Sequence, residues 1–493
     1  MENETMKKWR VNWRGCGCGH SVYIYLFSLY PILFLYQQNI SEVAFRVILP
    51  PMALAIALTM ALWLCLKPVV KNWEKRALVI FLILLLFFYY QLIHDALAEV
   101  IGRLGKPLSA LPPALAIGAG AALAVFWILR SKRSFSAPGN ILTVILLALL
   151  AWNVGGILLY HVRNANVKNA RIFLQKKETR VPAPASSKPD IYCFFIDEFA
   201  SLETIASIFH YDNSAFAERM RVAGFFIAEQ SRSFYVWTPE AIASVLNMGK
   251  LPAKTDPALL IRQNKVSRFL KEQGYSIVDF PYEGLTALDD SQQHYFYAQE
   301  RASVFFNDFY RTLAEMSILY PLVEKWQKDD DKYALFFRRR VLYVFEQMPA
   351  IVKLAGPKFV LVHLFSPHAP FVFDQEGGVV PAEHAIDYSV RKYYLEQYLY
   401  ISRRLAETME MILKNSAAPP IIVVQSDHGY RGSFRKPFLQ VVPEAEKRKI
   451  FLSLNLPGYP YAKLDAALSP LNVFRLILNR YFGQNLALAP ARE

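Results

Sequence analysis

The sequence predicts a protein in two parts: an N-terminal all-α transmembrane bundle and a C-terminal α/β domain with a mostly parallel sheet. Of its 493 residues, 54% are hydrophobic, yet nearly all the long apolar runs lie before residue 165. After about residue 189, short apolar runs alternate with helical patterns. Alternation of this kind favours a parallel sheet covered by helices.

The first part holds five apolar runs that are long enough, or nearly so, to cross a bilayer, which takes about 20 apolar residues in a helix. They span 21–37, 47–66, 77–93, 111–130 and 141–162. Helices of a soluble protein carry a polar face, which argues against buried soluble helices here. We therefore expect a transmembrane domain over residues 21–165, after a cytoplasmic tail of residues 1–20.

Basic residues in the short loops predict the orientation of these helices. Eleven lie in the tail and in the loops after the second and fourth spans: Lys7, Lys8, Arg10, Arg14, Lys67, Lys71, Lys75, Arg76, Arg130, Lys132 and Arg133. The other side has three, namely Arg46, Arg103 and Lys106. This bias places the N-terminus in the cytoplasm, and an odd number of spans then places everything after residue 165 outside. No small-residue cleavage site follows the first run, so it should remain as an anchor.

The formal net charge of +14 suits a nucleic-acid-binding protein. Many of these cations lie in the loops or beside the membrane, however, so no nucleic-acid partner is expected. Residues 166–188 form a juxtamembrane segment and linker, whose basic first part suits either an interfacial helix or a solvated connector. Of the four cysteines only Cys193 lies in the outer domain, which excludes an internal disulfide there.

The outer domain, residues 189–493, holds six runs typical of buried strands: 190–196, 224–229, 275–280, 358–365, 421–426 and 449–456. Helical patterns such as 389–415 lie between them. In open α/β sheets, ligands bind beyond the carboxyl ends of the strands. Functional residues are therefore expected at those ends.

Three strand ends carry residues that can hold a metal ion. Asp197 follows the first strand, His368 the fourth, and the pair Asp427 and His428 the fifth. Parallel strands would bring them to one edge, where two aspartates and a histidine suit Zn²⁺, Mn²⁺ or Mg²⁺. Taken singly, an aspartate after a strand is most often a helix cap, and an Asp-His pair is usually a turn with a surface histidine.

A threonine adds a hydroxyl to this set. The stretch "YVWTPEAIASVLNM" (235–248) predicts a helix with Thr238 as N-cap and Pro239 as first helical residue. The Thr238 hydroxyl has two interpretations. It either only caps the helix, or it is a nucleophile whose alkoxide and target phosphate are stabilised by the helix N-terminus.

Four segments in this order resemble the alkaline phosphatase/sulfatase superfamily, in its membrane-anchored, sulfatase-like branch. They are "KPDIYCFFIDEFAS", "SRSFYVWTPEAIASVLNM", "KFVLVHLFSPHAPFVFD" and "PPIIVVQSDHGYRG". That branch includes lipoteichoic acid synthases and phosphoethanolamine and phosphoglycerol transferases. The resemblance covers roughly residues 189–485, and five spans before an outer catalytic domain also match those transferases.

The resemblance implies a role for each of these residues. Asp197, Asp427 and His428 would be metal ligands, Thr238 the nucleophile and fourth ligand, and His368 a group facing the substrate or leaving group. It implies one divalent cation and a phosphotransferase of the bacterial cytoplasmic membrane with a periplasmic or extracellular catalytic domain. The enzyme would move an alcohol-phosphate group, of phosphoethanolamine or phosphoglycerol type, from a membrane lipid to an envelope glycan or lipid.

Departures from the family pattern limit these implications. "WTPEA" lacks the Cys and Arg of the C/S-x-P-x-R motif that sulfatases mature to formylglycine, so sulfate-ester hydrolysis by that route is not expected. The carboxylate pair of a two-metal site is only partly matched by Asp197 and Glu198, which favours one metal. Two alternatives stay open: a sulfatase-like hydrolase (a phosphodiesterase or phosphatase) using the same site, and a non-catalytic envelope assembly protein.

The charge bias makes the topology testable. Alkaline phosphatase fused after residue 493 should be active, and green fluorescent protein at the same point should be dark, because the C-terminus is expected outside. A fluorescent fusion without phosphatase activity would contradict this orientation.

Overall fold

The structure is a computed structural model that describes residues 21–40, 43, 45–102, 111–169, 188–253, 255–281, 286–295, 308–321, 330–381, 384–432 and 441–490. The chain divides into two compact units. One contains residues 1–163 and 304–326, and the other contains residues 164–303 and 327–493. Residues 308–321, which lie within the outer domain by sequence, therefore group with the N-terminal helices.

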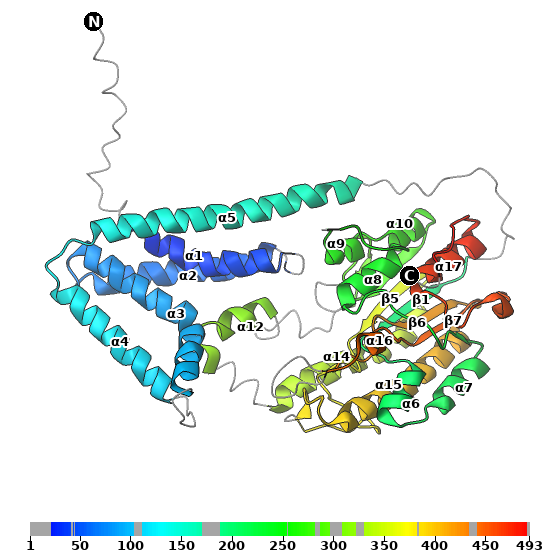
Figure 1. Cartoon of the computed structure of the whole chain (residues 1–493). Helices are drawn as coiled ribbons and strands as arrows, with labels where there is room; N and C mark the ends of the chain where they lie inside the picture. The colour runs from blue at the N-terminus through cyan, green and yellow to red at the C-terminus, as the bar shows by residue number, and fades with distance from the viewer. Residues whose placement is uncertain are drawn as a thin grey trace, which may run out of the picture. The chain divides into compact units, whose positions relative to one another are not determined.

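Five helices form most of the first unit (Figure 1). They are α1 (Val22–Gln38), α2 (Phe45–Leu66), α3 (Trp73–Gly102), α4 (Leu111–Arg130) and α5 (Ser136–Asn169), and each covers one of the predicted spans. By length and composition, α2 to α5 can cross a membrane, whereas α1 has 17 residues. The tail with its two cysteines and most of the juxtamembrane segment lie outside the described residues.

A seven-stranded sheet in the order β2-β7-β6-β1-β5-β3-β4 forms the centre of the second unit. Its strands are β1 (Ile191–Ile196), β2 (Phe226–Ile227), β3 (Ser276–Phe280), β4 (Gln293–His294), β5 (Lys358–Leu364), β6 (Ile421–Ser426) and β7 (Leu452–Asn455). From β6 to β4 neighbouring strands are parallel, and β7 is antiparallel to both β6 and β2. The predicted strands are present; the two-residue β4 is too short to stand out in the sequence.

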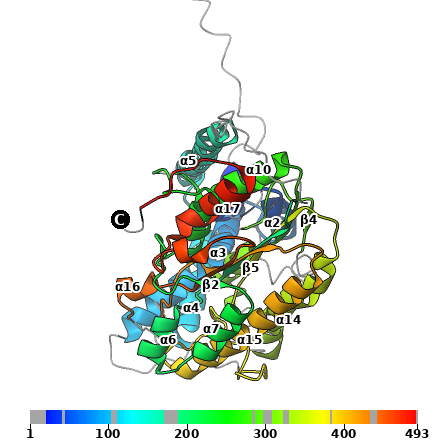
Figure 2. The same ribbon diagram turned by 90° about the vertical axis from the view of Figure 1, so that its right-hand side faces the viewer.

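Helices cover both faces of this sheet (Figures 1 and 2). One face carries α8 (Thr238–Leu246), α9 (Pro257–Arg262), α10 (Lys265–Glu272) and α17 (Val473–Phe482). The other carries α6 (Leu202–Phe209), α7 (Ser214–Val222), α14 (Asp330–Val352) and α15 (Arg391–Asn415), and the short α16 (Glu444–Lys447) follows β6 in the chain. This arrangement confirms the predicted fold class.

The central strand β1 is apolar along its whole length because both faces of the sheet are covered there. All six residues of β1 are buried. Ile191, Cys193 and Phe195 join the core beneath α8, α10 and α17, and the residues between them point to the opposite layer. Continuous apolar runs of this kind are typical of parallel strands buried on both faces.

The register of the central strands positions the functional residues. Ile196, the last residue of β1, lies beside Leu364 of β5 and Ser426 of β6. Three adjacent parallel strands therefore end at the same level, and the segments that follow them begin at one edge of the sheet.

Candidate metal centre

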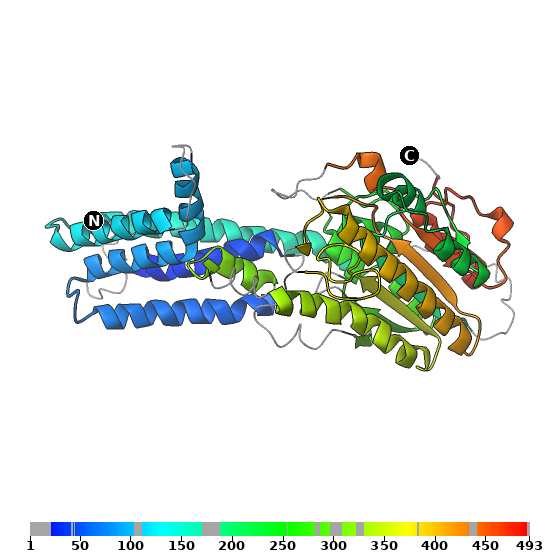
Figure 3. The same ribbon diagram turned by 90° about the horizontal axis from the view of Figure 1, so that it is seen from below.

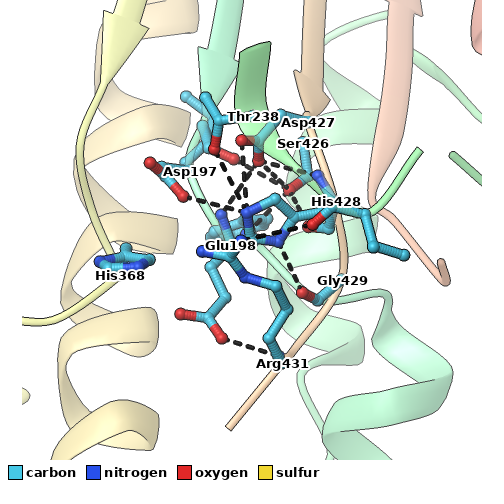
Figure 4. A network of polar contacts seen from close by, with 12 residues as sticks. Asp197, Glu198, Thr238, His368, Ser426, Asp427, His428, Gly429 and Arg431 are labelled. Atoms are coloured by element: carbon cyan, nitrogen blue, oxygen red, sulfur yellow. Dashed lines mark hydrogen bonds and ion pairs between the residues drawn. The ribbon is translucent and has the colours of Figure 1, made fainter. Parts of the chain in front are cut away.

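Asp197, Asp427 and His428 converge at this edge, with one potential ligand atom from each lying within 4.8 Å of the others (Figure 4). His428 Nε2 lies 3.4 Å from Asp197 Oδ1 and 3.4 Å from Asp427 Oδ2. Those two buried carboxylate oxygens accept no hydrogen bond from the described residues. Because buried polar atoms normally have a partner, the group fits a divalent cation bound between these three side chains.

The remaining oxygen of Asp427 is fixed by the backbone. Asp427 Oδ1 accepts hydrogen bonds from the N–H groups of Glu198, at 3.1 Å, and His428, at 2.8 Å. The Ser426 hydroxyl accepts from the N–H of Phe199 and lies 2.9 Å from the carbonyl oxygen of Ile196. The ends of β1 and β6 are thus tied together, and Asp427 Oδ2 is left to face the metal-binding position.

The His428 ring is oriented in the same way. Its Nδ1 lies 2.9 Å from the carbonyl oxygen of Gly429. A carbonyl only accepts, so Nδ1 carries a proton, and Nε2 is the ring atom that faces the two carboxylates. Gly429 is required here because a Cβ atom would meet the carbonyl oxygens of Glu446 and Lys449.

Charges around the site shift two pKa values in opposite directions. Burial alone would lower the pKa of His428, but Asp427 and Asp197 raise it above its ordinary value. Burial alone would raise the pKa of Asp197, but His368, His363 and His428 hold it well below its ordinary value. Metal binding at Nε2 would therefore displace a proton from His428.

Thr238 lies at the same place, but its role in the helix differs from the prediction. The N-cap of α8 is Trp237, so the helix begins one residue earlier than the sequence predicts, and Thr238 makes no capping hydrogen bond. Its Oγ1 instead lies 3.4 Å from His428 Nε2. The hydroxyl is thus directed toward the metal-binding atoms, and the interpretation of Thr238 as a simple cap is wrong.

His368 lies on the segment that follows β5. Its Nδ1 is 2.6 Å from the carbonyl oxygen of Ala369, and its ring centroid is 4.7 Å from that of Phe365. Its backbone N–H donates to the carbonyl oxygen of Asp197 at 3.3 Å. Figure 4 shows the ring next to the Asp197 carboxylate. The structure therefore brings together all five residues singled out in the sequence.

One neighbour of Asp197 was not predicted. His363, inside β5, is buried, and its Nε2 lies 3.7 Å from Asp197 Oδ2. It supports the oxygen of Asp197 that points away from His428. The signal in the sequence was a polar residue within the otherwise apolar run of β5.

Glu198 faces away from the metal-binding position. Its carboxylate accepts hydrogen bonds from the Tyr388 hydroxyl and the Arg431 backbone N–H, both at 2.7 Å. Its φ of 59° lies in the left-handed region, where a non-glycine residue is uncommon and strained. This turn directs Asp197 and Glu198 to different partners. Glu198 therefore anchors the segment after His428.

Arg431 adds a positive charge beside the nucleophile candidate. It is 8% exposed, and its guanidinium carbon lies 5.0 Å from the ring centroid of Trp237, the residue before Thr238. Arg431 Nη1 is 3.4 Å from the carbonyl oxygen of Val236. Arg431 forms no ion pair with any residue that the structure describes. An enclosed guanidinium without a carboxylate suits an anionic ligand.

No model of a known protein family matches the chain, and no curated protein sequence matches it. Several solved structures are similar. The periplasmic domain of EcEptC from Escherichia coli, in complex with Zn, has 14% identity and a TM-score of 0.42, covering 62% of this chain and 86% of that one. The lipooligosaccharide phosphoethanolamine transferase EptA from Neisseria meningitidis has 11% identity and a TM-score of 0.41. This match covers 94% of this chain and 95% of that one. An alkaline phosphatase superfamily protein from Vibrio parahaemolyticus has 14% identity and a TM-score of 0.37. This match covers 61% of this chain and 71% of that one.

The geometry predicts that the purified full-length protein binds about one divalent cation per chain. Asp427→Asn and His428→Ala should each lose most of it, because removing one of about four ligands opens the site. Asp289→Asn is the control, since Asp289 pairs with Arg262 elsewhere on the surface. Metal analysis should separate the two groups, and equal occupancy in all four proteins would contradict a metal site here.

Proposed function

We propose that the protein is a metal-dependent phosphotransferase with Thr238 as its nucleophile. It takes an alcohol-phosphate group, of phosphoethanolamine or phosphoglycerol type, from a membrane lipid and passes it to an envelope glycan or lipid. One observation carries this proposal: the Thr238 hydroxyl lies 3.4 Å from His428 Nε2, which in turn faces the unsatisfied oxygens of Asp197 and Asp427. A hydroxyl that only capped α8 would instead accept a hydrogen bond from a backbone N–H in the first turn of that helix.

In the first half-reaction Thr238 attacks the phosphorus of the donor. A bond from Oγ1 to phosphorus forms, the bond from phosphorus to the lipid alcohol breaks, and the hydroxyl proton ends on the departing alcohol. His368, partly exposed at the edge of the site, is placed to deliver that proton. In the second half-reaction an acceptor hydroxyl attacks the phosphothreonine, and its proton returns to Thr238. A divalent cation held by Asp197, Asp427 and His428 would supply Lewis-acid stabilisation of the negative charge.

Two further groups suit an anionic substrate. The N–H groups in the first turn of α8 are without helical partners, and the helix dipole places partial positive charge at that end. Arg431 brings a full positive charge beside the same turn. Together they would bind the oxygens of the transferred phosphate. Because these groups are already in position, they would stabilise the negative charge of the transition state without rearranging.

The apolar helices of the first unit favour a lipid donor, because they would hold the protein at the surface where such donors lie. We place the protein in the bacterial cytoplasmic membrane with a cytoplasmic N-terminus, as the basic loops predict.

A hydrolase is the second candidate, since water can take the place of the acceptor at the same site. Product analysis with labelled membrane lipids, with and without a glycan acceptor, separates the two. Transfer of label to the glycan supports the transferase, and release of the free alcohol-phosphate alone supports the hydrolase.

Replacing the nucleophile should stop turnover without unfolding the domain. Thr238→Ala is expected to lower kcat by at least about 10³-fold, as removal of other enzymic nucleophiles does, with an unchanged melting temperature because the hydroxyl caps nothing. Thr238→Ser should retain part of the activity. Brief exposure to donor should leave an alcohol-phosphate on the peptide containing Thr238, which mass spectrometry would detect and identify. Ser233→Ala is the control; normal turnover by Thr238→Ala would place the nucleophile elsewhere.

Arg431 is expected to contribute to catalysis through its positive charge. Arg431→Gln is expected to lower kcat/KM by about 10–100-fold, because hydrogen bonds to charged groups contribute about 1.5–3 kcal/mol. Metal occupancy should stay unchanged, and Arg431→Lys should recover part of the loss. Arg219→Gln, which breaks only the surface pair with Glu410, is the control. Wild-type kinetics for Arg431→Gln would restrict Arg431 to packing on Trp237.

A further inference from the structure

Residues 308–321, here called the docking segment, pack within the first unit although the chain on either side belongs to the second. The segment begins with α12 (Asp308–Glu315), which lies beside α1 (Figures 1 and 3). Phe309 is 4% exposed and belongs to the same apolar core as α1, α2 and α3. Leu313 and Met316 pack against that core. The segment is therefore part of the helical bundle.

The first hydrogen bond of the docking segment goes to a carbonyl that α2 cannot satisfy. The Tyr310 hydroxyl donates to the carbonyl oxygen of Val47 at 2.9 Å. In an α-helix the donor to Val47 would be residue 51, and in a tighter turn residue 50. Both are prolines, which have no N–H. Tyr310 thus supplies the donor that the sequence of α2 omits.

The second hydrogen bond joins the docking segment to α3 at an irregular turn of that helix. The Ile318 N–H donates to the carbonyl oxygen of Phe87 at 2.8 Å. Two residues further on, Tyr89 has non-helical angles of φ −118° and ψ 15°. Kinks occur where the helical hydrogen-bond ladder is interrupted. Within a bilayer a carbonyl without a helical donor has no water to bond to, and the docking segment supplies a donor at both positions.

The end of the docking segment exposes apolar side chains next to this turn. Ile318 is 48% exposed and Leu319 is 39% exposed. About one turn to either side of Phe87, α3 itself exposes Ile83 and Leu92, as expected of a helix surrounded by lipid. Apolar side chains are therefore exposed both on α3 and at the end of the docking segment.

We propose that the docking segment is embedded in the membrane, where it completes the hydrogen bonding of α2 and α3 and presents Ile318 and Leu319 to the acyl chains of lipids. In the order of the chain it lies between β4 and α14. The outer domain would thus have a second membrane attachment, in addition to the linker after α5. This inference rests on packing and hydrogen bonding and is independent of the proposed phosphotransfer.

The test uses the full-length protein in phosphatidylcholine vesicles, with its four cysteines replaced by alanine and one cysteine introduced for a fluorescent label. Leu319→Cys probes the docking segment, Leu92→Cys marks the exposed face of α3, and Val222→Cys, on exposed α7, marks the water-facing control. Lipids with spin labels on their acyl chains should quench the label at 319 as they do at 92. Aqueous iodide should quench only the label at 222. Iodide quenching at 319 without acyl-chain quenching would overturn the proposal.

A second variant tests the hydrogen bond itself. Tyr310→Phe removes only the hydroxyl, so acyl-chain quenching at 319 should fall and the melting temperature of the protein should decrease. Tyr481→Phe is the matched control, because its hydroxyl donates to the carbonyl oxygen of Pro457 within the other unit, and quenching at 319 should not change. If Tyr310→Phe alters neither property, α2 does not depend on this donor and that part of the proposal fails.

Discussion

The parallel pairing of β1 with β5 on one side and β6 on the other is the interaction on which the candidate site depends. The pairing continues one residue past the strand, where the N–H of Asp197 donates to the carbonyl oxygen of Leu364 at 2.9 Å. Ser426 ties the other side. A slip of one residue would turn every side chain to the opposite face. Asp197 would then face the core, and Asp427 would lose its partner.

The site buries two carboxylates, although carboxylates are ordinarily exposed to water. Asp197 and Asp427 are both 2% exposed, and burying an ionised carboxylate is costly unless it is paired. Three imidazoles surround Asp197, and backbone N–H groups hold one oxygen of Asp427. One oxygen of each carboxylate still lacks a donor among the described residues. The fold thus maintains a locally unfavourable arrangement that a cation would relieve.

A single turn connects the metal-binding group to the proposed anion-binding group. The left-handed conformation of Glu198 sends its carboxylate away from Asp197 and toward the backbone of Arg431. Arg431 then contacts Trp237, which precedes Thr238. Displacing Glu198 would therefore disturb the charge beside the proposed nucleophile without removing a proposed metal ligand. This link explains how Glu198 belongs to the site although its carboxylate bonds to Tyr388 and to the backbone of Arg431.

The sequence by itself determined the two-part architecture, the central strands, the four candidate residues that follow strand ends and Thr238 at the start of a helix, because apolar runs, polar breaks and helix-start signals are local patterns. Tertiary structure decided which strands are neighbours, and with it the support of Asp197 by His363 and the different directions of Asp197 and Glu198. It also decided the place of residues 308–321. An eight-residue amphipathic helix has the same pattern on a soluble surface as against membrane helices. Only its hydrogen bonds to the carbonyls of Val47 and Phe87, far away in the sequence, and its packing in the same core identify its partner.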